Sequence, residues 1–246
     1  MISKKGQTRE IRQVIERSDV IVQVLDARDP EGSRCIELED QIKEGSKKLI
    51  FLLNKIDLVP EEAVDQWITH YKQQKQLCLK FKATGNLKPE AKEGADKDEE
   101  MEDAKDESGR TMLMDVLFEY ARKFADKKDQ ETIAVGVIGY TNSGKSSVIN
   151  CLKRRAACPT SSNTFLTKSK QEVRLNQMVT LVDTPGIVHI SETDQQGTQV
   201  IRSALQVEQI ENPLGPLKSI FEKIEKVELL RHYRIGGFET VDQFLE

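Results

Sequence analysis

The sequence has few cysteines, and none of them lie in a pattern that binds metal. The four cysteines among 246 residues include no pair with the close CxxC spacing of zinc sites. They are also too sparse for the disulfide framework of a small secreted domain. We therefore expect reduced thiols in a compartment of the cytoplasmic type.

Long apolar runs and a large excess of one charge are absent as well. No segment approaches the roughly 18 apolar residues of a membrane-spanning helix, and residues 1–16 contain no apolar core of signal-peptide length. The net charge of −4 gives no overall attraction to nucleic acid. We expect a chain that is neither secreted nor membrane-spanning, with no membrane among its partners.

What the sequence does contain is a series of short apolar runs that alternate with amphipathic segments. Strands are predicted where the runs are rich in β-branched residues, at 20–26, 48–54, 77–83 and 133–139. Helices are predicted where apolar residues have helical spacing, at 7–17, 33–46, 61–74 and 111–125. Two further runs, 171–175 and 178–183, predict a hairpin around Asn176 and Gln177. This order indicates an α/β fold with a mostly parallel, six-stranded sheet flanked by helices.

Two other segments differ in character from this alternation. Residues 87–109 contain ten acidic and four basic residues and no aromatic, which predicts a disordered insert, with a functional acidic arm as the alternative. From about residue 194 the chain is predicted to be helical, with breaks at 211–216 and 234–237. Thr240 and Gln243 have the spacing of a capping box that opens a last helix.

The stretch GYTNSGKSS, residues 139–147, follows an apolar strand and predicts a phosphate-binding loop. Gly139 and Gly144 allow backbone amides to converge on phosphate oxygens, and the next helix directs its N-terminus at the same anion. Lys145 is predicted to reach the terminal phosphates and Ser146 to ligate Mg²⁺. A glycine-rich turn that binds nothing is the alternative.

The tetrapeptide NKID, residues 54–57, also ends a predicted strand, where open parallel sheets bind ligands. Asp57 is predicted to read guanine, because its two acceptor oxygens match the adjacent N–H donors on that base. Adenine lacks this pair of donors, so an ATP-dependent enzyme is disfavoured. Lys55 is expected to lay its stem along the base and Asn54 to brace the loop.

The segment DTPG, 183–186, closes the apolar strand 178–183 about 40 residues after the phosphate loop. Asp183 is predicted to meet the Mg²⁺ shell, and the Gly186 amide to meet the γ-phosphate. Between the two motifs, Thr167 is the preferred switch hydroxyl for the metal, with Thr164 as the alternative. A polar surface loop without a ligand role remains open for both threonines.

Together these motifs resemble the YlqF-related, nucleostemin-like family of circularly permuted GTPases. The resemblance is carried by DARDP (26–30), NKIDLVP (54–60), FKATG (81–85), GYTNSGKSS (139–147), FLTKS (165–169) and DTPG (183–186). It implies a P-loop NTPase fold in which the guanine-reading half precedes the phosphate-binding half. Such a rearrangement is feasible because domain termini often lie close together.

The resemblance implies a domain plan and a binding site. A permuted GTPase domain is expected over 1–194, comprising a guanine-reading half (1–86), the acidic insert (87–109) and a phosphate and switch half (110–194). A C-terminal helical extension is expected over 195–246, in a chain that corresponds to the GTPase core of a longer protein. The residues expected to bind GTP are Asn54, Lys55, Asp57, Lys82, Ala83, Gly139, Asn142, Ser143, Gly144, Lys145, Ser146, Ser147, Asp183 and Gly186. The metal ligands expected are Ser146, Thr167 and Asp183, and the catalytic residues expected are Lys145, Thr167 and Asn142.

Two positions bear on the rate of hydrolysis that the resemblance implies. Ile187 stands where Ras-like enzymes place a water-orienting Gln, which implies slow intrinsic turnover. Asn142 occupies the position that binds potassium in related GTPases, so K⁺ is a candidate cofactor beside GTP or GDP and Mg²⁺. An Asn142 that only braces the loop is the alternative.

The family consists of ribosome-assembly GTPases, and its eukaryotic nucleostemin-like branch is largely nucleolar. The resemblance therefore implies a monomeric GTPase of the nucleus and nucleolus that binds the preribosomal large-subunit particle, with its rRNA and ribosomal proteins. The alternative is a nucleotide-gated protein- or RNA-binding module in which hydrolysis is incidental.

Overall fold

The computed structural model describes residues 4–45, 47–83, 109–128, 132–153, 171–184 and 214–245. The chain divides into two compact units, residues 1–187 and residues 188–246. Within the described ranges, no helix is both long and apolar enough to cross a membrane.

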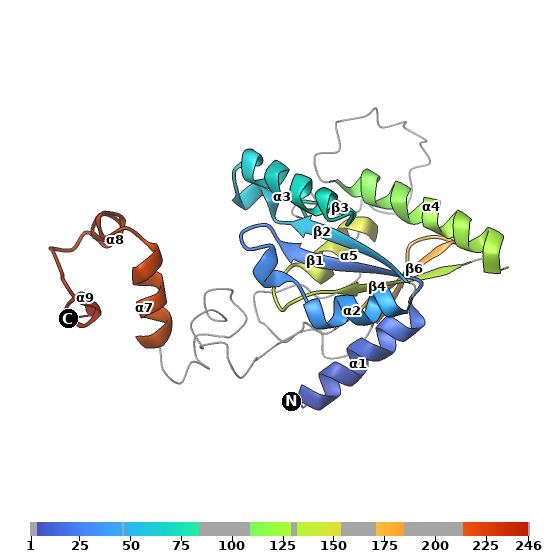
Figure 1. Cartoon of the computed structure of the whole chain (residues 1–246), viewed down its shortest axis with the longest axis horizontal. Helices are drawn as coiled ribbons and strands as arrows, with labels where there is room; N and C mark the ends of the chain where they lie inside the picture. Colours follow the sequence, from blue (N-terminus) through green and yellow to red (C-terminus); the bar gives the residue numbers. More distant parts are fainter. Residues whose placement is uncertain are drawn as a thin grey trace, which may run out of the picture. The chain divides into compact units, whose positions relative to one another are not determined.

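The first unit is built on one six-stranded sheet with the strand order β3-β2-β1-β4-β6-β5 (Figure 1). Its strands are β1 (Val20–Asp26), β2 (Lys48–Asn54), β3 (Cys78–Lys80), β4 (Ile133–Ile138), β5 (Gln171–Arg174) and β6 (Val179–Asp183). All neighbours pair in parallel except β5, which runs antiparallel to β6. The predicted α/β fold, its mostly parallel sheet and its hairpin are confirmed.

The two halves of the chain meet in the middle of this sheet. β1 pairs with β2 on one side and with β4 on the other, where Val20 lies opposite Val135. In a parallel arrangement the carboxyl ends of the strands share one edge, where open α/β sheets bind ligands. Asp26, Asn54 and the loop after Ile138 therefore come to the same edge, although β4 follows β2 by about eighty positions in the sequence.

Helices cover both faces of the sheet. They are α1 (Lys4–Arg17), α2 (Ile36–Glu44), α3 (Glu61–Gln73), α4 (Arg110–Lys128) and α5 (Lys145–Lys153). Val22 of β1 belongs to the core beneath α4 and α5, whereas Ile21 packs in the core formed with α1 and α2. Leu25 belongs to a third cluster, beneath α3. Burial on both faces explains why β1 is a continuous apolar run and not an alternating one.

Two predicted elements are shorter in the structure, and a third lies almost entirely outside the described residues. The helix expected at 33–46 is shorter, because Glu31–Ser33 forms a separate 3-10 turn, η1, before α2 begins at Ile36. The strand expected at 77–83 is limited to Cys78–Lys80, at the edge of the sheet beside β2. Of the predicted acidic insert, only Gly109 lies within the described residues.

Gly109 itself is closely packed and shows why a glycine stands there. Its φ is +71°, and a Cβ on it would lie 2.0 Å from the Lys80 carbonyl oxygen. The chain therefore enters α4 pressed against the end of β3, an approach that only glycine permits.

The second unit contains α7 (Leu214–Lys223), α8 (Lys226–Tyr233) and α9 (Val241–Leu245). The predicted helical tail begins at about residue 194, and its part before Leu214 lies outside the described residues. The ring of Phe244 lies 4.8 Å from that of Phe221 and 5.0 Å from that of Phe238, between centroids. These edge-on contacts form a small aromatic core.

The ends of these helices depart from prediction in two details. Pro216 does not interrupt the helix, because it lies in the first turn of α7. The backbone N–H that proline lacks would have no partner within the helix at that position. At α9, the Gln243 amide donates to Thr240 Oγ1 as in a capping box. The Gln243 side chain, however, accepts from the amide of Glu239 and not from that of Thr240.

Candidate nucleotide-binding site

The loop between β4 and α5 depends on two glycines with left-handed backbones. Gly139 has a φ of +152° and Gly144 a φ of +97°. A Cβ on Gly144 would lie 2.3 Å from Asn54 Nδ2, and one on Gly139 would lie 2.6 Å from the Val24 carbonyl oxygen. The loop thus lies directly against the ends of β1 and β2, and side chains at these positions would push it away.

Lys145 is the first residue of α5 and is 6% exposed. Its Nζ donates to the Tyr140 carbonyl oxygen over 2.8 Å, across the mouth of the loop. Burial lowers the pKa of Lys145, and the nearby Asp183 carboxylate opposes only part of this shift, so the pKa is about 8. A buried ammonium that has lost most of its hydration favours an anionic ligand, such as a phosphate group.

Ser146 and Asp183 form a pair of hard oxygen donors at the same edge. Ser146 Oγ donates to Asp183 Oδ2 over 2.9 Å, which brings the start of α5 to the end of β6. The next residue, Thr184, is fixed by a 2.7 Å hydrogen bond from its hydroxyl to the Val137 carbonyl oxygen. A hydroxyl and a carboxylate suit the preference of Mg²⁺ for oxygen ligands, so these residues fit the metal that the motifs imply.

Asn54 connects three segments of the site. Its side-chain amide donates to the Ser143 carbonyl oxygen over 2.9 Å, and its Oδ1 accepts from the Ala83 amide over 3.2 Å. The residue is 1% exposed, so both bonds are protected from water. One side chain therefore ties the NKID turn to the phosphate loop and to the chain after β3.

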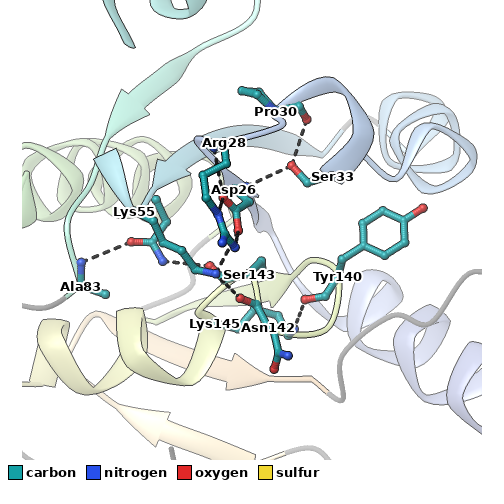
Figure 2. Close-up of polar contacts among 11 residues, drawn as sticks. Asp26, Arg28, Pro30, Ser33, Lys55, Ala83, Tyr140, Asn142, Ser143 and Lys145 are labelled. Atoms are coloured by element: carbon teal, nitrogen blue, oxygen red, sulfur yellow. Dashed lines mark hydrogen bonds and ion pairs between the residues drawn. The ribbon is translucent and has the colours of Figure 1, made fainter. Parts of the chain in front are cut away.

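Lys55 makes a second link between the two halves (Figure 2). Its Nζ donates to the Asn142 carbonyl oxygen over 2.6 Å and pairs with Asp26 Oδ2 at 2.9 Å. Both Lys55, with a φ of 64°, and Asn142, with a φ of 62°, have left-handed backbones. Asp57 follows in the 3-10 turn η2 (Ile56–Leu58), with an exposed side chain.

Asp26 was not among the site residues expected from the sequence, where it appears only as the first residue of DARDP. It forms a local ion pair, in which Arg28 Nε and Nη2 donate to the two carboxylate oxygens over 2.9 and 2.7 Å. The Lys55 contact was not foreseen because it depends on the β1–β2 register, in which Asp26 lies opposite Asn54. Burial raises the pKa of Asp26, but the hydrogen bonds from Arg28 and Lys55 outweigh it and lower the pKa to about 2.

The remaining expected residues fall into two groups. Lys82 and Ser147 are half-buried at this edge, and the Ser143 hydroxyl is buried with no hydrogen-bond partner among the described residues. Thr164, Thr167, Gly186 and Ile187 lie outside the described residues.

The fold and these contacts define a P-loop GTPase domain in which the guanine motif precedes the phosphate loop. A family model described as "50S ribosome-binding GTPase" matches residues 134–232. The chain is also similar to GNP-bound YlqF from T. maritima, with a TM-score of 0.58 and 23% identity, covering 97% of this chain and 80% of that one. That likeness supports the permuted fold.

Two curated relatives are similar along the whole chain. The guanine nucleotide-binding protein-like 3 homolog of Caenorhabditis elegans is 38% identical over 98% of this chain and 43% of its own length. The nucleolar GTP-binding protein 2 of Saccharomyces cerevisiae is 32% identical over 100% of this chain and 47% of its own length. The chain belongs to the YlqF-related, nucleostemin-like family of circularly permuted GTPases. It spans less than half the length of these curated relatives.

Proposed function

We propose that this domain binds GTP with Mg²⁺, hydrolyses it slowly, and acts in the assembly of the large ribosomal subunit. The observation that carries the proposal is the pair of bonds from Asn54 and Lys55 to the phosphate loop. These bonds hold the NKID turn against the phosphate loop, which supports the proposal that both motifs bind one nucleotide. Relatives named nucleolar GTP-binding protein 2 support the assembly role.

The chain's own residues bind and orient the nucleotide. Asp57 accepts the N–H donors of guanine, while Lys55 lies beside the base. An ammonium has three N–H donors, so Lys145 is able to keep its bond to Tyr140 and still donate to a terminal phosphate. Ser146 and Asp183 hold Mg²⁺, which when bound neutralises charge on the phosphate oxygens.

Hydrolysis is slow in this proposal because the side chain of Ile187 has no polar atom to orient the attacking water. Thr167, with Thr164 as the alternative, completes the metal shell, and the Gly186 amide contacts the γ-phosphate. Potassium bound by Asn142 is the proposed stimulus. Asn also adopts left-handed backbones more readily than most residues, so bracing the loop remains the other role for Asn142.

The proposed partner is the precursor of the large ribosomal subunit, through its rRNA and proteins, in the nucleolus. The chain is proposed to act as a monomer. Its GTPase domain is proposed to cover residues 1–194 and its helical extension residues 195–246. A nucleotide-gated binding module, in which hydrolysis is incidental, is the second candidate, and the observation that favours it is Ile187.

The test is a titration of nucleotide-free protein with fluorescent GDP, GTP and ATP analogues in Mg²⁺, in KCl and in NaCl, with hydrolysis followed in the same samples. Guanine-selective binding with turnover that rises in KCl supports the GTPase and the role of Asn142. Guanine-selective binding without turnover in either salt favours the gated module. Equal affinity for ATP and GTP contradicts the role given to Asp57.

A further inference from the structure

Asp26 lies between the two loops of the proposed site without belonging to either motif. Its carboxylate pairs with both Arg28 and Lys55, which share the oxygen Oδ2 (Figure 2). The side chains of Asp26 and Lys55 are 16% and 24% exposed, so their ion pair is largely shielded from solvent. Because Asp26 stays ionised at neutral pH, the attraction to Lys55 is always present.

The Lys55 ammonium needs such a partner to stay in place. A lysine side chain has four rotatable bonds, and fixing them costs conformational entropy. The Asn142 carbonyl offers the ammonium one neutral acceptor. The Asp26 carboxylate adds an opposite charge on the same ammonium, and this attraction holds Lys55 Nζ more firmly than the carbonyl does alone.

From Lys55 a chain of hydrogen bonds continues through the phosphate loop. Lys55 Nζ donates to the carbonyl oxygen of the peptide bond between Asn142 and Ser143. The N–H of that same peptide bond, on Ser143, donates to the Tyr140 carbonyl oxygen over 3.3 Å. That same Tyr140 oxygen accepts Lys145 Nζ. Asp26 is thus connected, through Lys55 and one peptide of the loop, to Lys145, the residue proposed to contact the phosphates.

We propose that Asp26 is a positioning residue for nucleotide binding. By holding the Lys55 ammonium against the Asn142 carbonyl, it fixes the phosphate loop relative to the guanine-reading turn before nucleotide arrives. The proposal rests on the proposed function and deepens it by assigning a role to a residue outside the binding motifs. Asp26 touches no substrate in this account and acts through Lys55.

The first experiment is a double-mutant cycle of Asp26→Asn and Lys55→Met, read out as the affinity for fluorescent GDP in Mg²⁺. Asn keeps the size of Asp26 and its acceptor for the Arg28 amide. We expect Asp26→Asn to weaken GDP binding about tenfold in the wild-type background and less than about twofold in the Lys55→Met background. A merely structural role would lower affinity equally in both backgrounds, and that result overturns the proposal.

Glu119→Gln is the matched control, because it removes the same charge from an ion pair with Lys123 on the exposed side of α4. It is expected to bind GDP like the wild type. Thermal unfolding of each variant checks that the fold is intact. An Asp26→Asn variant that is folded and binds GDP as tightly as Glu119→Gln overturns the proposal.

A second measurement needs no nucleotide and separates this inference from the proposed function. Amide hydrogen exchange of the nucleotide-free protein is expected to speed up about fivefold or more over residues 139–144 in Asp26→Asn, and not in Glu119→Gln. A wild-type protein that fails to bind GDP contradicts the proposed function, yet faster exchange in this loop still supports the positioning role. Unchanged exchange overturns it.

Discussion

The side-chain amide of Asn54 donates a 2.9 Å hydrogen bond to the carbonyl of Ser143, a residue 89 positions further along the chain. This bond joins the guanine motif to the phosphate loop, and its geometry does not depend on which motif is synthesised first. The parallel sheet needs only that β1, β2 and β4 lie side by side with their carboxyl ends together.

Replacing Asn54 by Ala is expected to destabilise the domain and weaken its nucleotide binding. The Ser143 carbonyl and the Ala83 amide lose their partner in a buried position, at a cost of roughly 2 kcal/mol. Urea unfolding of the nucleotide-free protein measures the loss. Gln74→Ala, which removes an exposed amide bonded to His70, is the control and should cost less than about 0.5 kcal/mol. If Asn54→Ala and Gln74→Ala have equal free energies of unfolding, the hydrogen bonds of Asn54 do not stabilise the domain.

Gly144→Ala is expected to abolish nucleotide binding. The new Cβ would lie 2.3 Å from Asn54 Nδ2, at a φ of +97° that is strained for alanine, so the loop must move at a cost of about 2–4 kcal/mol. GDP titration and thermal unfolding measure the two effects. In contrast, a Cβ on Gly237, between α8 and α9, would meet no atom within 4 Å, so Gly237→Ala should leave GDP affinity and stability nearly unchanged. Normal GDP affinity in Gly144→Ala would mean that the loop has another conformation.

The buried charge of Lys145 predicts a pH dependence in the nucleotide-free protein. Its folded pKa of about 8 lies below the ordinary 10.5, so between these values the unfolded chain binds more protons and stability rises with pH. Lys145→Met should therefore be more stable than the wild type at pH 7, and this advantage should shrink by the order of 1–3 kcal/mol by pH 10.5. Urea unfolding from pH 7 to 10.5 measures the difference.

Lys123→Met serves as the control for this pH series, because Lys123 is exposed on α4 and pairs with Glu119. It should show no such advantage at pH 7. A Lys145→Met variant whose stability relative to wild type stays constant across the series would indicate that the Lys145 ammonium is not destabilised by burial.

Ser146→Ala is expected to remove most of the Mg²⁺ dependence of GTP binding. The hydroxyl is one of the two described oxygen donors that fit the metal, and it is oriented by Asp183 at 2.9 Å. GTP affinity at 5 mM Mg²⁺, a concentration on the order of those used for Mg²⁺-nucleotide sites, should fall about tenfold or more. The wild type in EDTA is the comparison, and the two should agree. A variant that still gains affinity from Mg²⁺ as the wild type does would place the metal elsewhere.

The sequence predicted β1 and β2 to the residue, because strands buried on both faces are uninterrupted apolar runs. It also located the glycine turns and NKID, where the chemistry depends on residues adjacent in the chain. It did not predict the Asp26–Lys55 pair, which arises from the register of two strands. The predicted length of β3 was too great. As an edge strand, β3 ends where it stops pairing with β2, and the sequence of the strand itself does not indicate that point.

The pairing of β1 with β4 has a consequence for how the chain tolerates change. Val22 and Ile50 from the first half share one core with Leu113 and Val148 from the second, so neither half has a complete interior alone. One fragment that ends at Ala83 and another that begins at Gly109 would therefore be obligate complements, because each supplies apolar side chains that the other must cover.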